Sequence, residues 1–297
     1  MLAVELELLG ESVQIGHWPD FRKCKPASTI LLEFTPLAYS RVGFSLPLLL
    51  QVCRWNHRGC RVVSYFHELP FPNGHQWKRR LAVLIQWLYC LILTGLSWRC
   101  LVNQESGLRH LKWPGSGNRV SFLPVFSNIG QAVTVDHPLQ RPLQVIVFGS
   151  AGKRRHAHSL VAESGGYRRV FGPLVRVLDV GEPLNSTDPI PAEVECLGPL
   201  SSESVFELLL HSRYGFFYSE PDQFSKSGVF AAYCAAGVIP VIACRSPSVS
   251  PYYLGMADLV SSATLDLRTE AVWSRGREWA SRFNAKTAAA TILSAFL

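Results

Sequence analysis

The chain has 297 residues, of which 48% are hydrophobic and 17% are charged, which excludes a disordered protein and favours a globular one with two domains. Its net charge of +7 favours anionic partners, but no aromatic-interleaved basic motif accompanies the charge, so we expect no nucleic acid partner. The eight cysteines show no CxxC pair and no zinc-binding spacing, so we expect reduced thiols in a cytoplasmic protein and no metal site. We expect no cofactor.

The first half of the chain alternates strand-like and helix-like segments. Short apolar runs predict strands at Ser12–His17, Thr29–Phe34, Cys60–Phe66, Cys100–Asn103 and Val120–Phe122. Helices are expected between them, at Leu46–Arg58, Leu81–Leu93 and Glu105–Leu111. This alternation is typical of βαβ units built around a parallel sheet. The first ten residues include Glu5 and Glu7 and lack a basic start before an apolar core, so we expect no signal peptide.

Residues 81–98 form an uncharged, apolar segment directly after the basic triplet 78–80. A membrane-spanning helix needs about 20 such residues, which makes the segment a borderline candidate. Gln86, Thr94, Gly95 and Ser97 interrupt it. We therefore favour a buried or membrane-surface helix over a span, with residues 78–98 as a possible contact with anionic lipid at the inner face of the cytoplasmic membrane.

The proline-containing segment 135–142 separates the two halves, and the strand and helix alternation restarts after it. Strands are expected at Leu143–Phe148, Val175–Val180, Val194–Leu197, Gly215–Tyr218, Val238–Ala243 and Leu259–Val260. We therefore predict a first domain at 1–136, a linker at 137–142 and a second domain at 143–297. Two parallel-sheet domains of this kind commonly bind ligands in the cleft between them.

A small-residue turn followed by cations opens the second half, in VIVFGSAGKRRH. Gly149 and Ser150 would let backbone N–H groups approach an anion, and Lys153 and Arg154 would neutralise a diphosphate. The turn matches neither a P-loop nor a GxGxxG fingerprint, and a solvated surface turn is the alternative.

The segment 219–243 combines a loop, a small-residue helix and a buried strand. Ser225, Lys226, Ser227 and Gly228 suit the first turn of a helix, where free N–H groups attract phosphate, and either serine could be the N-cap. Gly237 would end the helix as a C′ glycine, and 238–243 is typical of a buried parallel strand. The alternative is an ordinary helix and strand of an α/β protein.

These motifs, in the order YFHELP, VIVFGSAGKRRH, VECLGPLSSESVFELLL and FSKSGVFAAYCAAGVIPVI, resemble a bacterial glycosyltransferase of the GT-B type, in the broad retaining group that uses nucleotide sugars. The resemblance implies an α/β fold with two Rossmann-like domains and transfer of a sugar from a nucleotide-diphosphate sugar to a glycan or lipid-linked acceptor. A first domain without its opening strand would follow, because 1–18 resembles the end of a first helix and a second strand. That strand would lie upstream of Met1 or be absent from a pruned domain.

The resemblance also implies roles for individual residues. His67 would lie near the transferred sugar or the acceptor hydroxyl, with Glu68 beside it. The donor phosphates would contact Gly149, Ser150, Lys153, Arg154, Ser225, Lys226, Ser227 and Gly228. Leu197 and Gly198 would lie against the nucleobase, and retention without a metal would follow from the group as a whole.

Two family carboxylates are replaced. The family commonly has a glutamate before the phosphate loop and a second one eight residues later, where this chain has Phe224 and Ala232. Glu220 would substitute for the ribose-binding carboxylate. These departures leave two rivals to the enzyme: a catalytically silent GT-B-like scaffold, and a membrane-associated protein without enzymatic activity.

Overall fold

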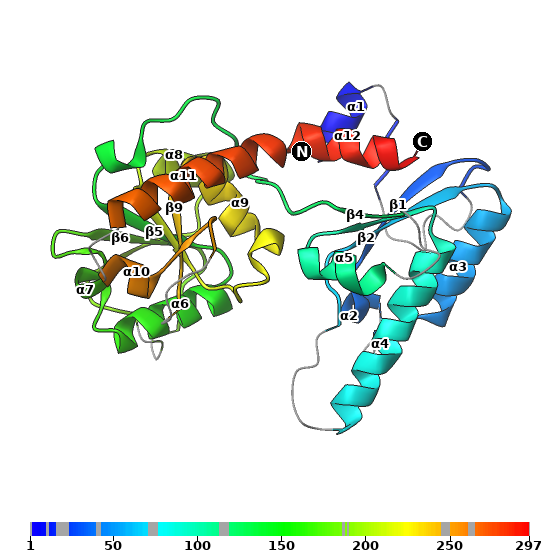
Figure 1. Cartoon of the computed structure of the whole chain (residues 1–297), viewed down its shortest axis with the longest axis horizontal. Coiled ribbons are helices and arrows are strands. Elements are labelled where there is room, and N and C mark those ends of the chain that lie inside the picture. Colours follow the sequence, from blue (N-terminus) through cyan, green and yellow to red (C-terminus); the bar gives the residue numbers. More distant parts are fainter. Residues whose placement is uncertain are drawn as a thin grey trace. The chain divides into compact units, whose positions relative to one another are not determined.

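A computed structural model describes residues 2–9, 12–15, 24–39, 43–70, 77–112, 119–185, 188, 190–244, 250–260 and 265–296. The chain forms two compact units, one of residues 1–124 with 286–297 and one of residues 125–285 (Figure 1). Compact units need not coincide with domains that fold alone, so the domain boundaries expected from the sequence stay a prediction.

The first unit contains four strands and helices that precede, connect and follow them. The described elements are α1 (Leu2–Leu8), β1 (Thr29–Phe34), α2 (Pro36–Tyr39), α3 (Leu46–His57), β2 (Arg61–Phe66), α4 (Trp77–Leu96), β3 (Arg99–Val102), α5 (Glu105–Leu111), β4 (Val120–Phe122) and α12 (Ala285–Phe296). The strands form a parallel sheet in the order β1-β2-β3-β4. The strand predictions from Thr29 to Phe122 are therefore confirmed to within a residue at each end, whereas residues 12–15 form no strand and 16–17 lie outside the described residues.

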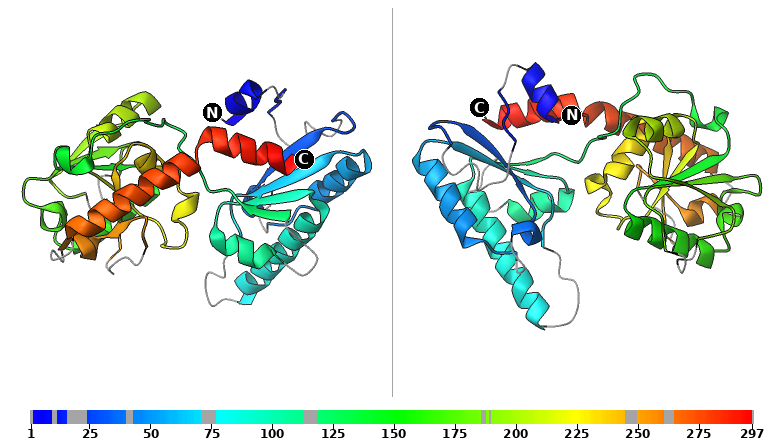
Figure 2. Two further views of the ribbon diagram at one scale, coloured as in Figure 1. Left: turned by 45° about the horizontal axis from the view of Figure 1, so that its top comes forward. Right: turned by 180° about the vertical axis from the view of Figure 1, so that it is seen from behind.

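Helices α3 and α4 lie side by side on one face of this sheet (Figures 1 and 2). Leu48, Val52 and Trp55 of α3 and Cys90 and Leu93 of α4 are fully buried there against the strands. Burial of this apolar area is what fixes the two helices on the sheet. α4 contains the uncharged segment of the sequence, and none of the described helices is long and apolar enough to cross a membrane.

The second unit contains the remaining strands. Its elements are η3 (Pro138–Gln140), β5 (Gln144–Phe148), α6 (Ala151–Glu163), α7 (Tyr167–Phe171), β6 (Arg176–Val180), β7 (Val194–Gly198), α8 (Ser202–Leu210), β8 (Tyr214–Phe217), η4 (Phe224–Lys226), α9 (Gly228–Ala235), β9 (Ile239–Ile242), β10 (Leu254–Gly255), α10 (Met256–Val260) and α11 (Leu265–Arg282). They form a six-stranded sheet in the order β10-β9-β8-β5-β6-β7, in which every pair is parallel. The expected α/β class with two parallel sheets is confirmed.

Helices α6 and α9 pack on opposite faces of the second sheet. Ala157 and Val161 of α6 join Val145 and Val147 of β5 in one core cluster. On the other face, the Tyr233 hydroxyl of α9 donates to the carbonyls of Ile146 and Phe216, at 3.0 and 3.1 Å. Gly215 admits this ring, since a Cβ there would lie 2.4 Å from Tyr233 Cδ1. Both helices therefore begin at the carboxyl edge of the sheet, next to β5 and β8.

The strand predicted at Leu259–Val260 is wrong. These residues end helix α10, and the last strand is the two-residue β10 before it. Asp258 explains the difference: its carboxylate accepts from the Gly255 N–H at 2.8 Å and pairs with Arg268. A carboxylate bonded to a free N–H at a helix start favours the helix over a strand.

Candidate functional site

The glycine turn after β5 brings the N-terminus of α6 close to that of α9. Gly149 has φ +119°, and a Cβ there would lie 3.0 Å from Val229 Cγ2 in the first turn of α9. Glycine is therefore required for the conformation as well as for the space. Ser150 is the N-cap of α6, although its hydroxyl makes no capping hydrogen bond.

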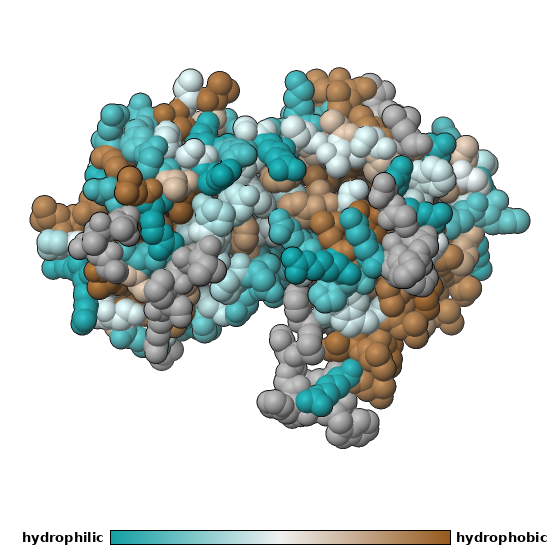
Figure 3. Space-filling view, in the orientation of Figure 1, coloured by the Kyte–Doolittle hydropathy of each residue, from teal (hydrophilic) through white to brown (hydrophobic). Residues whose placement is uncertain are grey.

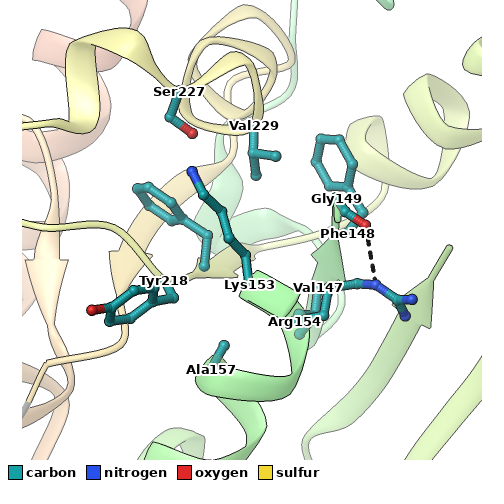
Figure 4. A pocket seen from close by; sticks show the side chains of 10 residues that line it. Val147, Phe148, Gly149, Lys153, Arg154, Ala157, Tyr218, Ser227 and Val229 are labelled. Carbon is teal, nitrogen blue, oxygen red and sulfur yellow. Dashed lines mark hydrogen bonds between the residues drawn. The ribbon is translucent and has the colours of Figure 1, made fainter. Parts of the chain in front are cut away.

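A pocket lies between the two helix starts, and Lys153 extends across it toward Ser227 (Figure 4). Its lining comprises Val147, Phe148, Gly149, Lys153, Arg154, Ala157, Phe217, Tyr218, Ser227 and Val229. Gly149, Lys153 and Ser227 were predicted on two separate motifs, and the fold brings them together at one pocket. The free N–H groups at two helix starts and one ammonium make it a suitable place for an anion.

Ser227 caps α9. Its hydroxyl accepts from the Phe230 N–H at 3.3 Å, and its carbonyl accepts from Ala231 at 3.0 Å. Gly228 and Val229 therefore stand in the first turn, where N–H groups have no partner within the helix. Of the two serines considered from the sequence, Ser227 is the cap, and Gly237 has the positive φ, +65°, of a C′ glycine.

Ser225 and Lys226 lie in η4, one turn before α9. Ser225 is 4% exposed, and its carbonyl accepts from the Val125 N–H at 3.0 Å. Lys226 is partly exposed. Neither is among the described residues that line the pocket, whereas Lys153 is, so Lys153 is the lysine that we place at the pocket.

The Arg154 side chain is directed into the unit. It is 1% exposed and pairs with Asp179, and it donates to the carbonyls of Gly149, at 3.1 Å, and Glu182. These bonds hold the loop after β5 against the loop after β6. Its guanidinium therefore supports the glycine turn from the interior of the unit, whereas the Lys153 ammonium faces the pocket.

A buried polar chain continues from this arginine. The His158 Nε2 lies 2.7 Å from Asp179 Oδ2, and its Nδ1 lies 2.9 Å from the Tyr167 hydroxyl. Burial raises the pKa of the Tyr167 phenol well above its usual range. Sequence reasoning missed this chain. The available signal was Asp179 within an otherwise apolar strand, since a buried carboxylate requires partners.

Leu197 and Gly198 end β7, two strands away from β5 at the same edge of the sheet. Gly198 has φ +72°, and its carbonyl accepts from the Gly181 N–H at 3.0 Å. Both residues are partly exposed and lie outside the described lining of the pocket.

Glu220 is exposed, and its Oε1 accepts from the Tyr218 hydroxyl at 2.7 Å. This hydrogen bond, together with burial, raises the pKa of the Tyr218 phenol. Because Tyr218 lines the pocket, the pair places a carboxylate near its rim. Sequence reasoning identified Glu220 and missed Tyr218.

The two positions that carry glutamates in the family hold apolar side chains here, Phe224 half-buried and Ala232 fully buried. Phe224 contacts the rings of Phe230 and Trp279, with centroids 4.9 and 5.6 Å away. Ala232 is 1% exposed inside α9. Neither position offers a polar group to a ligand.

In the first unit, His67 follows β2 at the carboxyl edge of the sheet. Its backbone N–H donates to Phe34, its carbonyl accepts from Asn103 Nδ2, both at 2.9 Å, and its Nε2 lies 3.7 Å from Glu33 Oε2. The imidazole lowers the pKa of the Glu33 carboxyl, against the opposing effect of partial burial. Glu68 is exposed, so the carboxylate beside the imidazole is Glu33, which sequence reasoning missed. The signal was a charged residue in the strand TILLEF.

No protein-family model matches the sequence, and no curated protein matches it. Solved structures match the fold. Anabaena HepE in complex with UDP superposes with a TM-score of 0.60 at 11% identity, covering 93% of this chain and 79% of HepE. The UDP-forming α,α-trehalose-phosphate synthase of Burkholderia vietnamiensis gives 0.59 at 11% identity, covering 99% and 75%. TarM of S. aureus gives 0.56 at 12% identity, covering 94% of this chain and 57% of TarM.

These structures are GT-B glycosyltransferases, and at such low identity the likeness shows the fold and no activity. The resemblance of the sequence motifs to that group is therefore confirmed at the level of architecture. The chain has the α/β fold of the GT-B glycosyltransferases, with two parallel sheets.

Proposed function

We propose that the protein is a glycosyltransferase that takes a sugar from a nucleotide-diphosphate sugar and transfers it to a glycan or lipid-linked acceptor. The observation that carries the proposal is the pocket at which Lys153 and the start of α9 meet. HepE has been solved with UDP and with UDP-glucose, which supports a donor of this class.

The donor diphosphate would bind to N–H groups of the Gly149 turn and of Gly228 and Val229, with Lys153 as the direct cation. Fixed N–H groups and a cation stabilise a leaving diphosphate, because its charge grows as the glycosidic bond breaks. We assign Arg154 a positioning role through Gly149, in view of its burial. Ser225 and Lys226 lie in η4, directly before α9, and would act indirectly by positioning the start of α9.

The nucleoside would lie along the carboxyl edge of the sheet. We assign the ribose to Glu220, whose carboxylate is held by Tyr218, and the nucleobase to the loop of Leu197 and Gly198. Glu220 takes over a task for which neither Phe224 nor Ala232 is suitable.

In the first unit, we assign His67 to contact the acceptor hydroxyl, and Glu33 orients the imidazole. Glu68 follows His67 at an exposed position. Ligands of open parallel sheets bind at this edge. We propose that the transfer needs no metal, because N–H groups and Lys153 supply the positive charge. We also propose that the transfer retains the anomeric configuration of the sugar. Proton NMR of the product tests retention, and turnover in EDTA tests the metal.

The test is UDP and GDP binding by calorimetry, followed by a nucleotide-sugar panel scored for diphosphate release with lipid and polysaccharide extracts as acceptors. Lys153→Gln should weaken diphosphate binding by about 10- to 100-fold, the loss expected for a charge-assisted contact. Arg155→Gln is the matched control, since it removes one charge from the same helix where that charge pairs with Asp188 at 2.7 Å.

Equal binding by wild type and Lys153→Gln would refute the phosphate site. His67→Gln separates the remaining possibilities, because it should retain nucleotide binding and lose transfer. If the wild type binds nucleotide but transfers sugar to no acceptor, the silent scaffold is favoured instead. The apolar residues Phe224 and Ala232, at positions where the family has carboxylates, favour the same alternative.

A further inference from the structure

The outer surface of α4 is apolar where a surface helix is normally polar. Its exposed residues after Arg80 are Leu81, Leu84, Ile85, Leu88, Ile92 and Gly95. Their spacing of three, four and seven residues places them on one side of the helix, over about 21 Å of its length. Leu84 and Leu88 are 65% and 58% exposed, so this stripe is turned away from the core.

Residues of α3 and of the segment just before it widen the stripe into a face. Phe44, Leu46 and Leu50 are 37%, 53% and 49% exposed, and the Phe44 ring contacts Tyr89 of α4 at 5.3 Å. Figure 3 shows a continuous hydrophobic surface in this region of the first unit. We call the stripe and these three residues the α3–α4 face. Contiguous apolar surface of this size marks a site of association with a protein or a membrane.

Cations border the α3–α4 face at both ends. Arg80 is exposed at the start of α4, and Arg54 is exposed one turn after Leu50 on α3. Beyond the end of α4, Trp98 is 44% exposed and lies 5.1 Å from the Arg61 guanidinium. Residues 34–104 contain eight Lys and Arg and one acidic residue, Glu68.

The charge of the whole chain follows the same division. The first unit has fifteen Lys and Arg and seven Asp and Glu, a net charge of +8, whereas the second has fourteen and fifteen, a net charge of −1. Cations at the start of α4 also oppose the helix dipole, so helix stability does not explain their place. An anionic surface explains both the charge and its location.

We propose that the α3–α4 face binds the surface of a bilayer containing anionic lipid, with the leucines and isoleucines of α4 in the acyl boundary and the bordering arginines at the phosphates. Such a face combines apolar burial with attraction to acidic head groups. A second copy of the chain fits less well, because a symmetric contact would bring like-charged borders together. The inference does not depend on the proposed enzymatic activity.

The test is co-sedimentation of the full chain, without nucleotide, with vesicles of phosphatidylcholine alone or mixed in equal parts with phosphatidylglycerol. Wild type should bind the mixed vesicles, and Leu84→Gln with Leu88→Gln should bind more than about tenfold less, because two buried leucines are lost. Arg54→Gln with Arg80→Gln should lower the affinity for the mixed vesicles by about tenfold or more and change the affinity for neutral vesicles little.

The matched control is Leu174→Gln with Leu267→Gln, which removes two leucines of the second unit that are even more exposed, at 87% and 78%. It should bind as wild type does. Failure of wild type to bind mixed vesicles, or equal loss in the control, would overturn the proposal. A dimer in analytical ultracentrifugation that only Leu84→Gln with Leu88→Gln disrupts, without vesicle binding, would assign the face to a second copy instead.

Discussion

Arg154 forms an ion pair with Asp179 beneath the Gly149 turn, and both side chains are almost fully buried, at 1% and 4% exposure. The same guanidinium donates to the carbonyls that follow β5 and β6. The pair is thus part of the scaffold that shapes the pocket, and its removal should act on stability first.

Asp179→Ala should cost about 3–5 kcal/mol of unfolding free energy, because it leaves Arg154 buried without its partner charge. Urea unfolding measures this loss. Glu195→Ala breaks an exposed pair with Arg176, which lies on β6 as Asp179 does, and should cost less than about 1 kcal/mol. Similar losses in both variants would contradict a structural role for the buried pair.

Gly149→Ala should weaken UDP binding and destabilise the fold by about 1 kcal/mol or more, since alanine is strained at φ +119° and its Cβ meets Val229. Gly152→Ala, three residues later, is the matched substitution. A Cβ there meets nothing within 4 Å in the first turn of α6, so stability should stay equal or rise. Calorimetry with UDP and thermal unfolding check both variants, and normal binding by Gly149→Ala would remove the turn from the site.

Ser227→Ala should cost about 1 kcal/mol, because the Phe230 N–H loses its cap, and should also weaken UDP binding. Ser201→Ala removes the cap of α8, where the hydroxyl accepts from Ser204 at 3.2 Å. It should cause a similar loss of stability with nucleotide affinity unchanged. Parallel effects of the two substitutions on affinity would show that the Ser227 result reflects stability alone.

The pair of Glu33 and His67 predicts a pH dependence of stability. Because folding lowers the Glu33 pKa, the pair stabilises the protein above the ordinary glutamate pKa, and this contribution is lost as the pH falls through the lowered value. Glu33→Gln should therefore have a lower free energy of unfolding than wild type near neutral pH, and the two values should converge in acid. The difference should stay below about 1 kcal/mol, since the Glu33 side chain is 61% exposed. Denaturant unfolding across this range tests it, and a difference that grows in acid would have the wrong sign.

The consecutive cations 153–155 show where sequence reasoning ends. In the sequence the three are equivalent, but successive helix positions point about 100° apart. Lys153 accordingly faces the pocket, Arg154 pairs with Asp179 in the interior, and Arg155 pairs with Asp188 at 45% exposure. The strand before them was predictable from four apolar residues in a row, whereas the direction of each cation depends on where the helix begins.

The same distinction explains the missed partners. His67 and Lys153 follow apolar strands, and the carboxyl ends of parallel strands meet at one edge, so their placement on an edge followed from topology. Glu33 lies beside His67 because β1 and β2 pair in register, Glu33 opposite Tyr65. Tyr218 reaches Glu220 within the loop that follows β8. Register and turn geometry are not encoded in a single motif.

Helix α12 belongs to the first unit, although it is the last helix of the chain, and Arg61 of β2 donates to the Phe296 carbonyl at its end. The unit that leaves the ribosome first is therefore completed last, after the whole of residues 125–285 has been made. A nascent chain would hold an unfinished first unit throughout synthesis of the second, and a stop codon in place of residue 286 would remove a piece of the first unit and leave the second whole.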